Sequence, residues 1–422
     1  MLGLWLPQLA GFPASWDAER CNVLSAWVHM DRKSNGSNWA KWYNPYFQSL
    51  WNPPADMFLR AASPWDACII VVPLGKHAYT SGQWRYELKE LQHAVPNWSD
   101  GRNVIIIDQS DVPITSFHRR THRLGHSLIV QSHTDYADFV QGFDVSIPIG
   151  FSPIGYSNTS HLRALWPIDA PRRSYLLSFK GQVALERMAD SFVRHSLFAL
   201  EHVSADARGR AVGVYLHCFE PRTGSRRRNS APDSSMGEQC LRSAARERLG
   251  PSYSELLNTT FALCPAGRSP ASYRMSEALA SGAIPVFLSG AGRHQVGGEA
   301  GHGAYVPPLG DVVRWEQMSL HVHHAHLYAM NATRLVALLS AVSAEEMLAM
   351  QRGVREAWEQ HLRPERVGHT LWAILRRRVS LRGSHALITR AHHTHDHHTH
   401  ARTMQRCILL LCACIEYTCI DC

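Results

Sequence analysis

An arginine and a glutamate three residues apart, Arg274 and Glu277, are the residues of this sequence most suited to binding chemistry. They follow a turn that contains Gly267, and their spacing places both side chains on one face of a helix. An arginine can bind a diphosphate through two parallel hydrogen bonds, and a carboxylate one turn later can accept both hydroxyls of a ribose. A solvated ion pair would show the same spacing, so the spacing alone leaves both interpretations open.

The stretch Cys264–Gly290 predicts a compact β–α–β unit around this pair. Thr260–Cys264 and Ala283–Leu288 are typical of buried strands, and the residues between them carry helix start and stop signals. Ser269 is the expected N-cap, and Gly282 is expected to end the helix. The helix would begin at the carboxyl end of a strand, where open α/β sheets bind ligands and free backbone N–H groups favour phosphate oxygens.

Buried strands recur in two series, which predicts two doubly wound α/β domains with mostly parallel sheets. The strands are expected at Ala67–Leu74, Asn103–Asp108 and Ser127–Ser132, then at Ser174–Gly181, where a turn should follow, and Ala211–His217. We expect an irregular segment at 1–65, domains at 66–170 and 171–378, and a His- and Cys-rich, disordered tail at 379–422. Ser343–Leu362 predicts a long helix with Ser343 as its N-cap.

The composition is that of a globular protein, with 45% apolar and 18% charged residues in a chain of 422. The net charge of +8 suits an anionic ligand without choosing among nucleotide, polyanion and nucleic acid.

The cysteines show no metal-ligand spacing and do not settle the redox compartment. Asn-x-Ser/Thr sequons favour a secreted or lumenal chain and stand at Asn35, Asn97, Asn158, Asn258 and Asn331. No segment is long enough to span a bilayer, so we expect membrane association only through an upstream anchor.

The residues Tyr253–Leu288 resemble the core of the exostosin-like glycosyltransferases, family 47. The shared pattern is Phe-x-Leu-x-Pro-x-Gly, then a helix with Ser-x-Arg, then Gly-Cys-Ile-Pro-Val, which is Gly-Ala-Ile-Pro-Val here because of Ala283. Further motifs match in the same order at Gly142–Gly150, Ser174–Gly181 and Val312–Leu327. The resemblance covers roughly Asp66 to Leu362.

This resemblance implies a GT-B fold, with two Rossmann-like doubly wound domains facing a cleft. Residues 66–170 would form the acceptor side, and 171–378 would bind a nucleotide sugar. Family members transfer sugars with inversion and generally without a bound metal, so we expect no metal and no cofactor beyond the donor. The resemblance implies that Arg274 and Lys180 stabilise the leaving diphosphate, that Ser272 and the Gly267 backbone assist, and that Glu277 holds the ribose.

The catalytic base is expected among polar residues that follow strands of the first domain, where inversion needs a group to take the acceptor proton. Asp108, Asp111 and His77 are the candidates, although strand-end polar residues more commonly cap neighbouring elements. Val104 and Arg314 replace a histidine and an aspartate that relatives often carry, which puts the acceptor in doubt more than the donor.

The expected function is an inverting glycosyltransferase that acts on a glycan or glycoprotein acceptor in the Golgi or secretory lumen, with no nucleic-acid partner. Two alternatives stay open. One is a catalytically inactive relative that only binds glycan or nucleotide, and the other is a phosphate-binding regulatory Rossmann protein.

Overall fold

The computed structural model describes residues 24–28, 49–74, 101, 103–108, 114, 119, 124–132, 134–135, 138–149, 173–184, 194, 196–219, 250–252, 254–266, 271–289, 305–323 and 332–381. The chain divides into a large compact unit, Met1–Ile374, and a small one, Leu375–Cys422. The elements below lie in the large unit, except for the last turns of helix α13. Over the ranges given above, no helix is both long and apolar enough to cross a membrane.

The first sheet is parallel throughout, and its described strands follow the order β2–β1–β3–β4–β5–β6. These strands are β1 Ser25–Val28, β2 Leu59–Arg60, β3 Ile69–Leu74, β4 Val104–Asp108, β5 Leu128–Gln131 and β6 Val145–Ser146. Strands β3, β4 and β5 are buried almost along their whole length, as parallel strands with both faces covered must be. Their continuous apolar runs predicted all three strands.

The N-terminal region also contributes to this sheet, which differs from the irregular segment expected at 1–65. Strand β1 lies between β2 and β3 and pairs with both. The Ser25 hydroxyl donates to the carbonyl of Asp66 (3.2 Å) and accepts from the backbone N–H of Cys68 (3.0 Å). A four-residue strand in a region rich in Trp, Asn and Pro gives no periodic signal, so the sequence did not reveal it.

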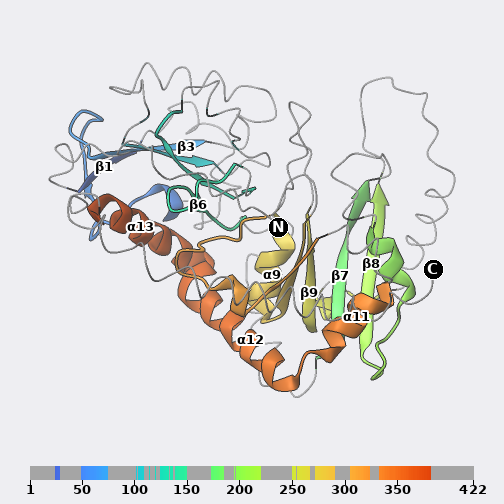
Figure 1. Cartoon of the computed structure of the whole chain (residues 1–422). Helices are drawn as coiled ribbons and strands as arrows, with labels where there is room; N and C mark the ends of the chain where they lie inside the picture. The colour runs from blue at the N-terminus through green and yellow to red at the C-terminus, as the bar shows by residue number, and fades with distance from the viewer. Residues whose placement is uncertain are drawn as a thin grey trace, which may run out of the picture. The chain divides into compact units, whose positions relative to one another are not determined.

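The second sheet is parallel as well, with its described strands in the order β11–β10–β9–β7–β8 (Figure 1). Its strands are β7 Tyr175–Ala184, β8 Ala211–Phe219, β9 Thr259–Pro265, β10 Ile284–Ser289 and β11 Leu320–His323. Helix α9, Tyr273–Ser281, connects β9 to β10, and helix α11, Ala332–Ala341, follows β11. Counted from β7, the strand order is 2-1-3-4-5, the order of flavodoxin-like doubly wound folds. The predicted α/β class with two Rossmann-like parallel sheets is confirmed.

This order fixes a topological switch point between β7 and β9. From β7 the chain moves outward to β8 and then returns to β9 on the other side of β7. In doubly wound sheets, the connections that leave the carboxyl ends of two such strands run in opposite directions and leave a crevice, and this is where these sheets bind their ligands. The start of α9, which follows β9, lies at this edge of the sheet.

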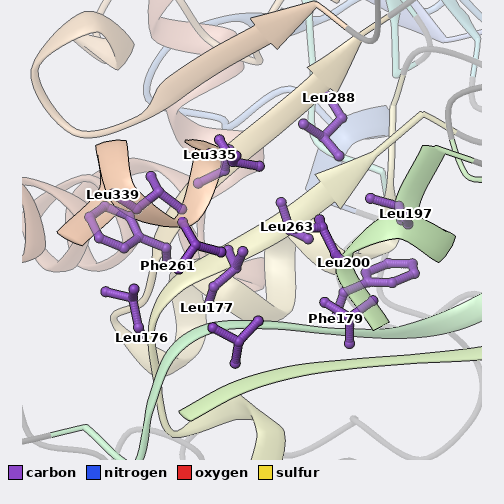
Figure 2. Close-up of a cluster of buried hydrophobic side chains, with 14 of the residues drawn as sticks. Leu176, Leu177, Phe179, Leu197, Leu200, Phe261, Leu263, Leu288, Leu335 and Leu339 are labelled. Atoms are coloured by element: carbon purple, nitrogen blue, oxygen red, sulfur yellow. The ribbon is translucent and has the colours of Figure 1, made fainter. Parts of the chain in front are cut away.

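Apolar side chains hold α11 against one face of the second sheet, as Figure 2 shows. Leu177 and Phe179 of β7 belong to the same buried cluster as Leu335 of α11. Ser178 lies between them on the strand and therefore points to the opposite face, where it contacts Arg274 of α9. Helices α9 and α11 thus cover opposite faces, as a doubly wound sheet requires.

The predicted long helix is present, with a change near its end. Helix α12 runs Ala344–Ala357, and the hydroxyl of its N-cap Ser343 accepts from the backbone N–H of Glu346 (3.1 Å), as predicted. A π-helical turn, Trp358–Leu362, completes the predicted range. Helix α13, Pro364–Leu381, then begins with a proline. The first N–H groups of a helix have no intrahelical acceptor, so a proline at this position costs no hydrogen bond.

A buried carboxylate, Asp206, ties the turn before β8 to α11. It accepts from the Ser340 hydroxyl (2.8 Å), from the Arg210 side chain (2.8 Å) and from the backbone N–H groups of Arg208 (3.0 Å) and Arg210 (2.7 Å). Burial alone would raise the pKa of Asp206, but the hydrogen bonds from Ser340 and Arg210 and the charge of Arg210 lower it from 3.8 to about 2. The charged carboxylate therefore stabilises the fold.

We expect Asp206→Asn to lower the free energy of unfolding by about 1–3 kcal/mol at pH 7, because it leaves buried donors without an anionic acceptor. Because the pKa is lower in the folded state, this contribution is complete above pH 3.8 and is lost as the pH falls towards 2. Urea unfolding at several pH values should show the difference from the parent chain shrinking below about pH 4. The matched control is Asp56→Asn on the surface, and an equal loss at every pH would contradict the assignment.

Candidate functional site

Helix α9 has defined caps at both ends. Its N-cap is Ser272, in extended conformation (φ −139°, ψ 135°), whose hydroxyl accepts from the backbone N–H of Arg274 at 3.3 Å. The sequence predicted Ser269 as the N-cap, and the helix starts later than that. Both serines carry a hydroxyl suited to this role, so the residue type alone could not distinguish them. Gly282 ends the helix at φ 70°, as predicted, and its N–H bonds to the carbonyls of Ala278 and Leu279.

The carboxyl end of α9 is held by arginines from elsewhere in the chain. Arg173 donates to the carbonyl of Ser281 at 3.0 Å, where positive charge complements the helix dipole. Burial, together with the positive charge of Arg355, lowers the pKa of Arg173 to about 10, so it stays charged at neutral pH. A Cβ on Gly282 would lie 3.1 Å from a guanidinium nitrogen of Arg355. The hydrogen bond from Arg173 thus stabilises the carboxyl end of the helix.

The Arg274–Glu277 pair is buried, which a solvated surface pair would not be. Arg274 is 3% exposed and Glu277 is 4% exposed, and the Nη1 of Arg274 lies 3.6 Å from the Oε2 of Glu277. Removing two charges from water costs several kcal/mol per ion, of which the mutual attraction returns only part. A solvated surface pair is therefore excluded, and the pair stands at the switch point of the second sheet.

A third group, Ser178 of β7, completes this arrangement. The Nη2 of Arg274 donates to the Ser178 hydroxyl at 3.3 Å, and that hydroxyl donates to the carbonyl of Leu256 at 2.6 Å. Sequence reasoning missed Ser178, although a polar residue inside the apolar run Leu176–Phe179 was a visible signal. We call Ser178, Arg274 and Glu277 the switch-point cluster.

Two further buried groups lie beside the cluster, and neither ionises near neutral pH. Burial raises the pKa of the Cys264 thiol to about 12, with the charge of Arg274 lowering it and that of Glu277 raising it. Burial likewise raises the pKa of Tyr305, whose hydroxyl donates to the Met275 sulfur at 3.5 Å. A protonated, buried thiol is unreactive, so Cys264 acts as packing under the pair.

Lys180 lies on the same strand face as Ser178, two residues further towards the carboxyl end of β7. It is half-buried, which leaves part of the side chain open to solvent. The turn expected at Gly181 is wrong, because β7 continues to Ala184 and pairs with β8 over that range. Lys180 is therefore a mid-strand residue, placed by the sheet and not by a loop.

The remaining predicted site residues are divided between the described and undescribed parts of the chain. Asp108 is the last residue of β4 and is 2% exposed, and its carbonyl accepts from the backbone N–H of Ser132 (3.3 Å). His77, Asp111 and Gly267 lie outside the described residues. Their roles stay predictions. Within the described ranges no three His, Cys, Asp or Glu side chains gather closely enough to hold a metal ion.

Comparisons with known proteins agree on one family. The model of the exostosin GT47 domain matches residues 20–338. Exostosin-1c of Danio rerio is 24% identical over 351 residues, which cover 82% of this chain and 42% of the relative. Exostosin-1 of Drosophila melanogaster is 25% identical over 292 residues, which cover 68% of this chain and 34% of the relative. The chain thus spans less than half the length of these relatives.

Among solved structures, the chain is similar to an alpha,alpha-trehalose-phosphate synthase (UDP-forming) from Burkholderia vietnamiensis. The TM-score is 0.40 at 12% sequence identity, over 84% of this chain and 81% of that one. The N-terminal domain of a trehalose-6-phosphate phosphatase from Candida albicans gives a TM-score of 0.40 at 11% identity, over 83% of this chain and 78% of that one.

Proposed function

The chain belongs to the exostosin GT47 family, and from this premise we propose that it is an inverting glycosyltransferase. It moves a sugar from a nucleotide sugar to a hydroxyl of a glycan or glycoprotein acceptor. The observation that carries the proposal is the buried Arg274–Glu277 pair at the switch point of the second sheet. A cation and an anion held at this position suit a ligand that has a diphosphate and a ribose side by side.

The roles of the residues follow from the charge that develops during transfer. As the acceptor oxygen bonds to the anomeric carbon, the bond to the diphosphate breaks and its electron pair leaves with the phosphate. Arg274 stabilises this charge, assisted by Lys180 from β7 and by the backbone around Gly267. The Ser272 hydroxyl accepts from its own helix and keeps its hydrogen to donate to a phosphate oxygen. Glu277 accepts hydrogen bonds from the ribose hydroxyls.

The first domain supplies the base in this proposal. Asp108, Asp111 and His77 stay the candidates that take the proton of the acceptor hydroxyl. The first sheet also has its switch point, between β1 and β3, and His77 follows β3 directly. Asp108 is the last residue of β4, one strand further from the switch point, and it is buried.

The test is a transfer assay with the purified chain. Uridine and guanosine diphosphate sugars are offered with a panel of glycan acceptors, and the configuration of the new linkage is read by proton NMR. The proposal expects one nucleoside diphosphate to be released together with a glycan of inverted configuration at the transferred carbon. Binding of a nucleotide sugar without turnover would favour the inactive relative. A retained configuration would contradict the inverting mechanism.

The secretory lumen is the proposed location, and two described residues support it. Cys68, the residue before β3, is disulfide-bonded, and structural disulfides form and persist in oxidising compartments. Asn258 belongs to an Asn-Thr-Thr sequon and lies at the amino-terminal end of β9, away from the start of α9. Its side-chain amide donates to Ser174 at 2.6 Å. The amide has a second hydrogen, so a glycan can replace that one while this bond is kept.

We therefore expect Asn258 to carry an N-linked glycan when the chain is expressed through a eukaryotic secretory pathway. Mass spectrometry of peptides before and after enzymatic deglycosylation measures the occupancy. Asn258→Gln should remove one glycan without changing nucleotide affinity, because the site lies at the opposite end of the strand. An unmodified Asn258 peptide in the secreted protein would contradict this prediction.

A further inference from the structure

Ser178 has one hydroxyl hydrogen, and the structure shows how it is used. The hydroxyl donates to the Leu256 carbonyl at 2.6 Å, in the 3-10 turn Glu255–Leu257 that precedes β9. Its oxygen keeps lone pairs to accept, and the Nη2 of Arg274 donates to it at 3.3 Å. The direction of both bonds is therefore fixed, because a guanidinium can only donate and a carbonyl can only accept. Ser178 links a rigid backbone acceptor to the arginine.

The two terminal nitrogens of the Arg274 guanidinium have different neighbours, a hydrogen-bond acceptor at Nη2 and an ion-pair partner at Nη1. Ser178 accepts from Nη2, and Glu277 lies 3.6 Å from Nη1. The two partners come from different elements, one from a sheet strand and one from the arginine's own helix. With Glu277 as its one partner, the guanidinium could still rotate about the contact between Nη1 and the Glu277 carboxylate. The contact with the strand adds the second fixed point that sets the orientation of the plane.

We propose that Ser178 is a positioning residue that orients the guanidinium of Arg274 for a nucleoside diphosphate. This inference rests on the proposed function, since it names what sets the geometry of the diphosphate-binding group. Ser178 does not touch the ligand in this account. It acts by keeping an arginine, whose free side chain has many rotamers, in one orientation before the ligand arrives, so that less entropy is lost on binding.

The buried surroundings explain why a hydroxyl is suited to this position. Ser178, like Arg274, is buried, and β7 places it directly beside Ala262 of β9. In this environment an alanine at 178 would leave both the arginine and the Leu256 carbonyl without their hydroxyl partner, and such losses weaken the fixed geometry. A threonine keeps the hydroxyl, whereas a valine has the same shape without it. Ser178→Thr and Ser178→Val therefore form a matched pair.

The experiment measures the dissociation constants of uridine diphosphate and guanosine diphosphate by calorimetry on the full chain. For the nucleotide that the parent chain binds, Ser178→Ala and Ser178→Val should weaken binding roughly 5- to 20-fold, and Ser178→Thr by less than about 3-fold. In an Arg274→Ala background, Ser178→Ala should cause almost no further loss, because its effect passes through the arginine. Ser340→Ala, at a second buried serine of this domain, is the control and should change stability only.

The outcomes separate this inference from the function on which it rests. If the parent chain binds neither nucleotide, the proposed function fails and the inference fails with it. If the parent chain binds and Arg274→Ala binds more weakly, but the threonine and valine variants bind equally well, the function stands and the inference is overturned. Additive losses in the double variant would also overturn it. If the alanine variant does not fold, the threonine and valine pair decides, since both members carry the same added bulk.

Discussion

Arg274→Met is expected to lower the rate of sugar transfer at least about 100-fold, the largest functional effect predicted for this chain. The proposed function assigns Arg274 to the leaving diphosphate, so the substitution removes the cation expected to stabilise its charge, while the methionine fills much of the same buried volume. Arg274→Lys should recover only a small part of the rate, because an ammonium group cannot make two parallel bonds to a diphosphate. The measurement is kcat/KM for the donor, together with the affinity for the nucleoside diphosphate.

A loss of stability has to be separated from this loss of function. Removing one partner of a buried ion pair leaves the other charge unpaired and costs about 3–5 kcal/mol. The double variant Arg274→Met, Glu277→Gln removes that charge, so it should recover stability while its transfer rate stays low. Arg210→Met is the matched control, because it breaks another arginine–carboxylate pair of the same domain. Normal transfer by the double variant would contradict the role given to Arg274.

Asp144→Asn is expected to lower the free energy of unfolding by about 3–5 kcal/mol, as large an effect on stability as that expected for Arg274→Met. Asp144 is buried and accepts from the side chain of Arg119 and from the backbone N–H groups of Ile129 (3.1 Å) and Val140 (2.9 Å). Each of these three groups donates a hydrogen bond to the carboxylate. The side-chain NH2 group of an asparagine would therefore face one of these donors with a donor of its own. Arg119 would also lose its anionic partner.

Denaturant unfolding followed by the intrinsic tryptophan fluorescence of the chain measures this effect. Asp56→Asn on the surface is the control and should change the free energy of unfolding by less than about 0.5 kcal/mol. A loss below about 1 kcal/mol for Asp144→Asn would contradict the prediction. The same contacts explain part of the Gly142–Gly150 motif: its aspartate is a structural acceptor that joins β5 to the residues before β6.

The longer inner strands of the two sheets could be predicted because parallel strands are buried on both faces, and continuous apolar sequence records that burial directly. Strands β3, β4, β5, β9 and β10 agree with the expected ranges within two residues at either end. The Ser343 cap could be predicted because it stands alone before a periodic helix. The ending of α9 at Gly282 followed from its freedom to adopt a positive φ.

The features that the sequence did not predict depend on contacts between distant residues. Burial of the Arg274–Glu277 pair follows from how β7, β9 and β10 surround α9, and helical spacing carries no record of that. Ser178 lies 96 positions from Arg274, so only the sheet order brings them together. The extension of β7 past Gly181 depends on pairing with β8, which overrides the local preference of glycine for a turn.

The burial of α9 on every side has a consequence for how this protein can acquire new specificity. All residues from Arg274 to Ser281 are buried, so the helix has no surface position at which a substitution would leave the packing undisturbed. Variants selected for a different donor sugar should therefore carry their changes in the segments that approach the start of the helix, and seldom on the helix itself.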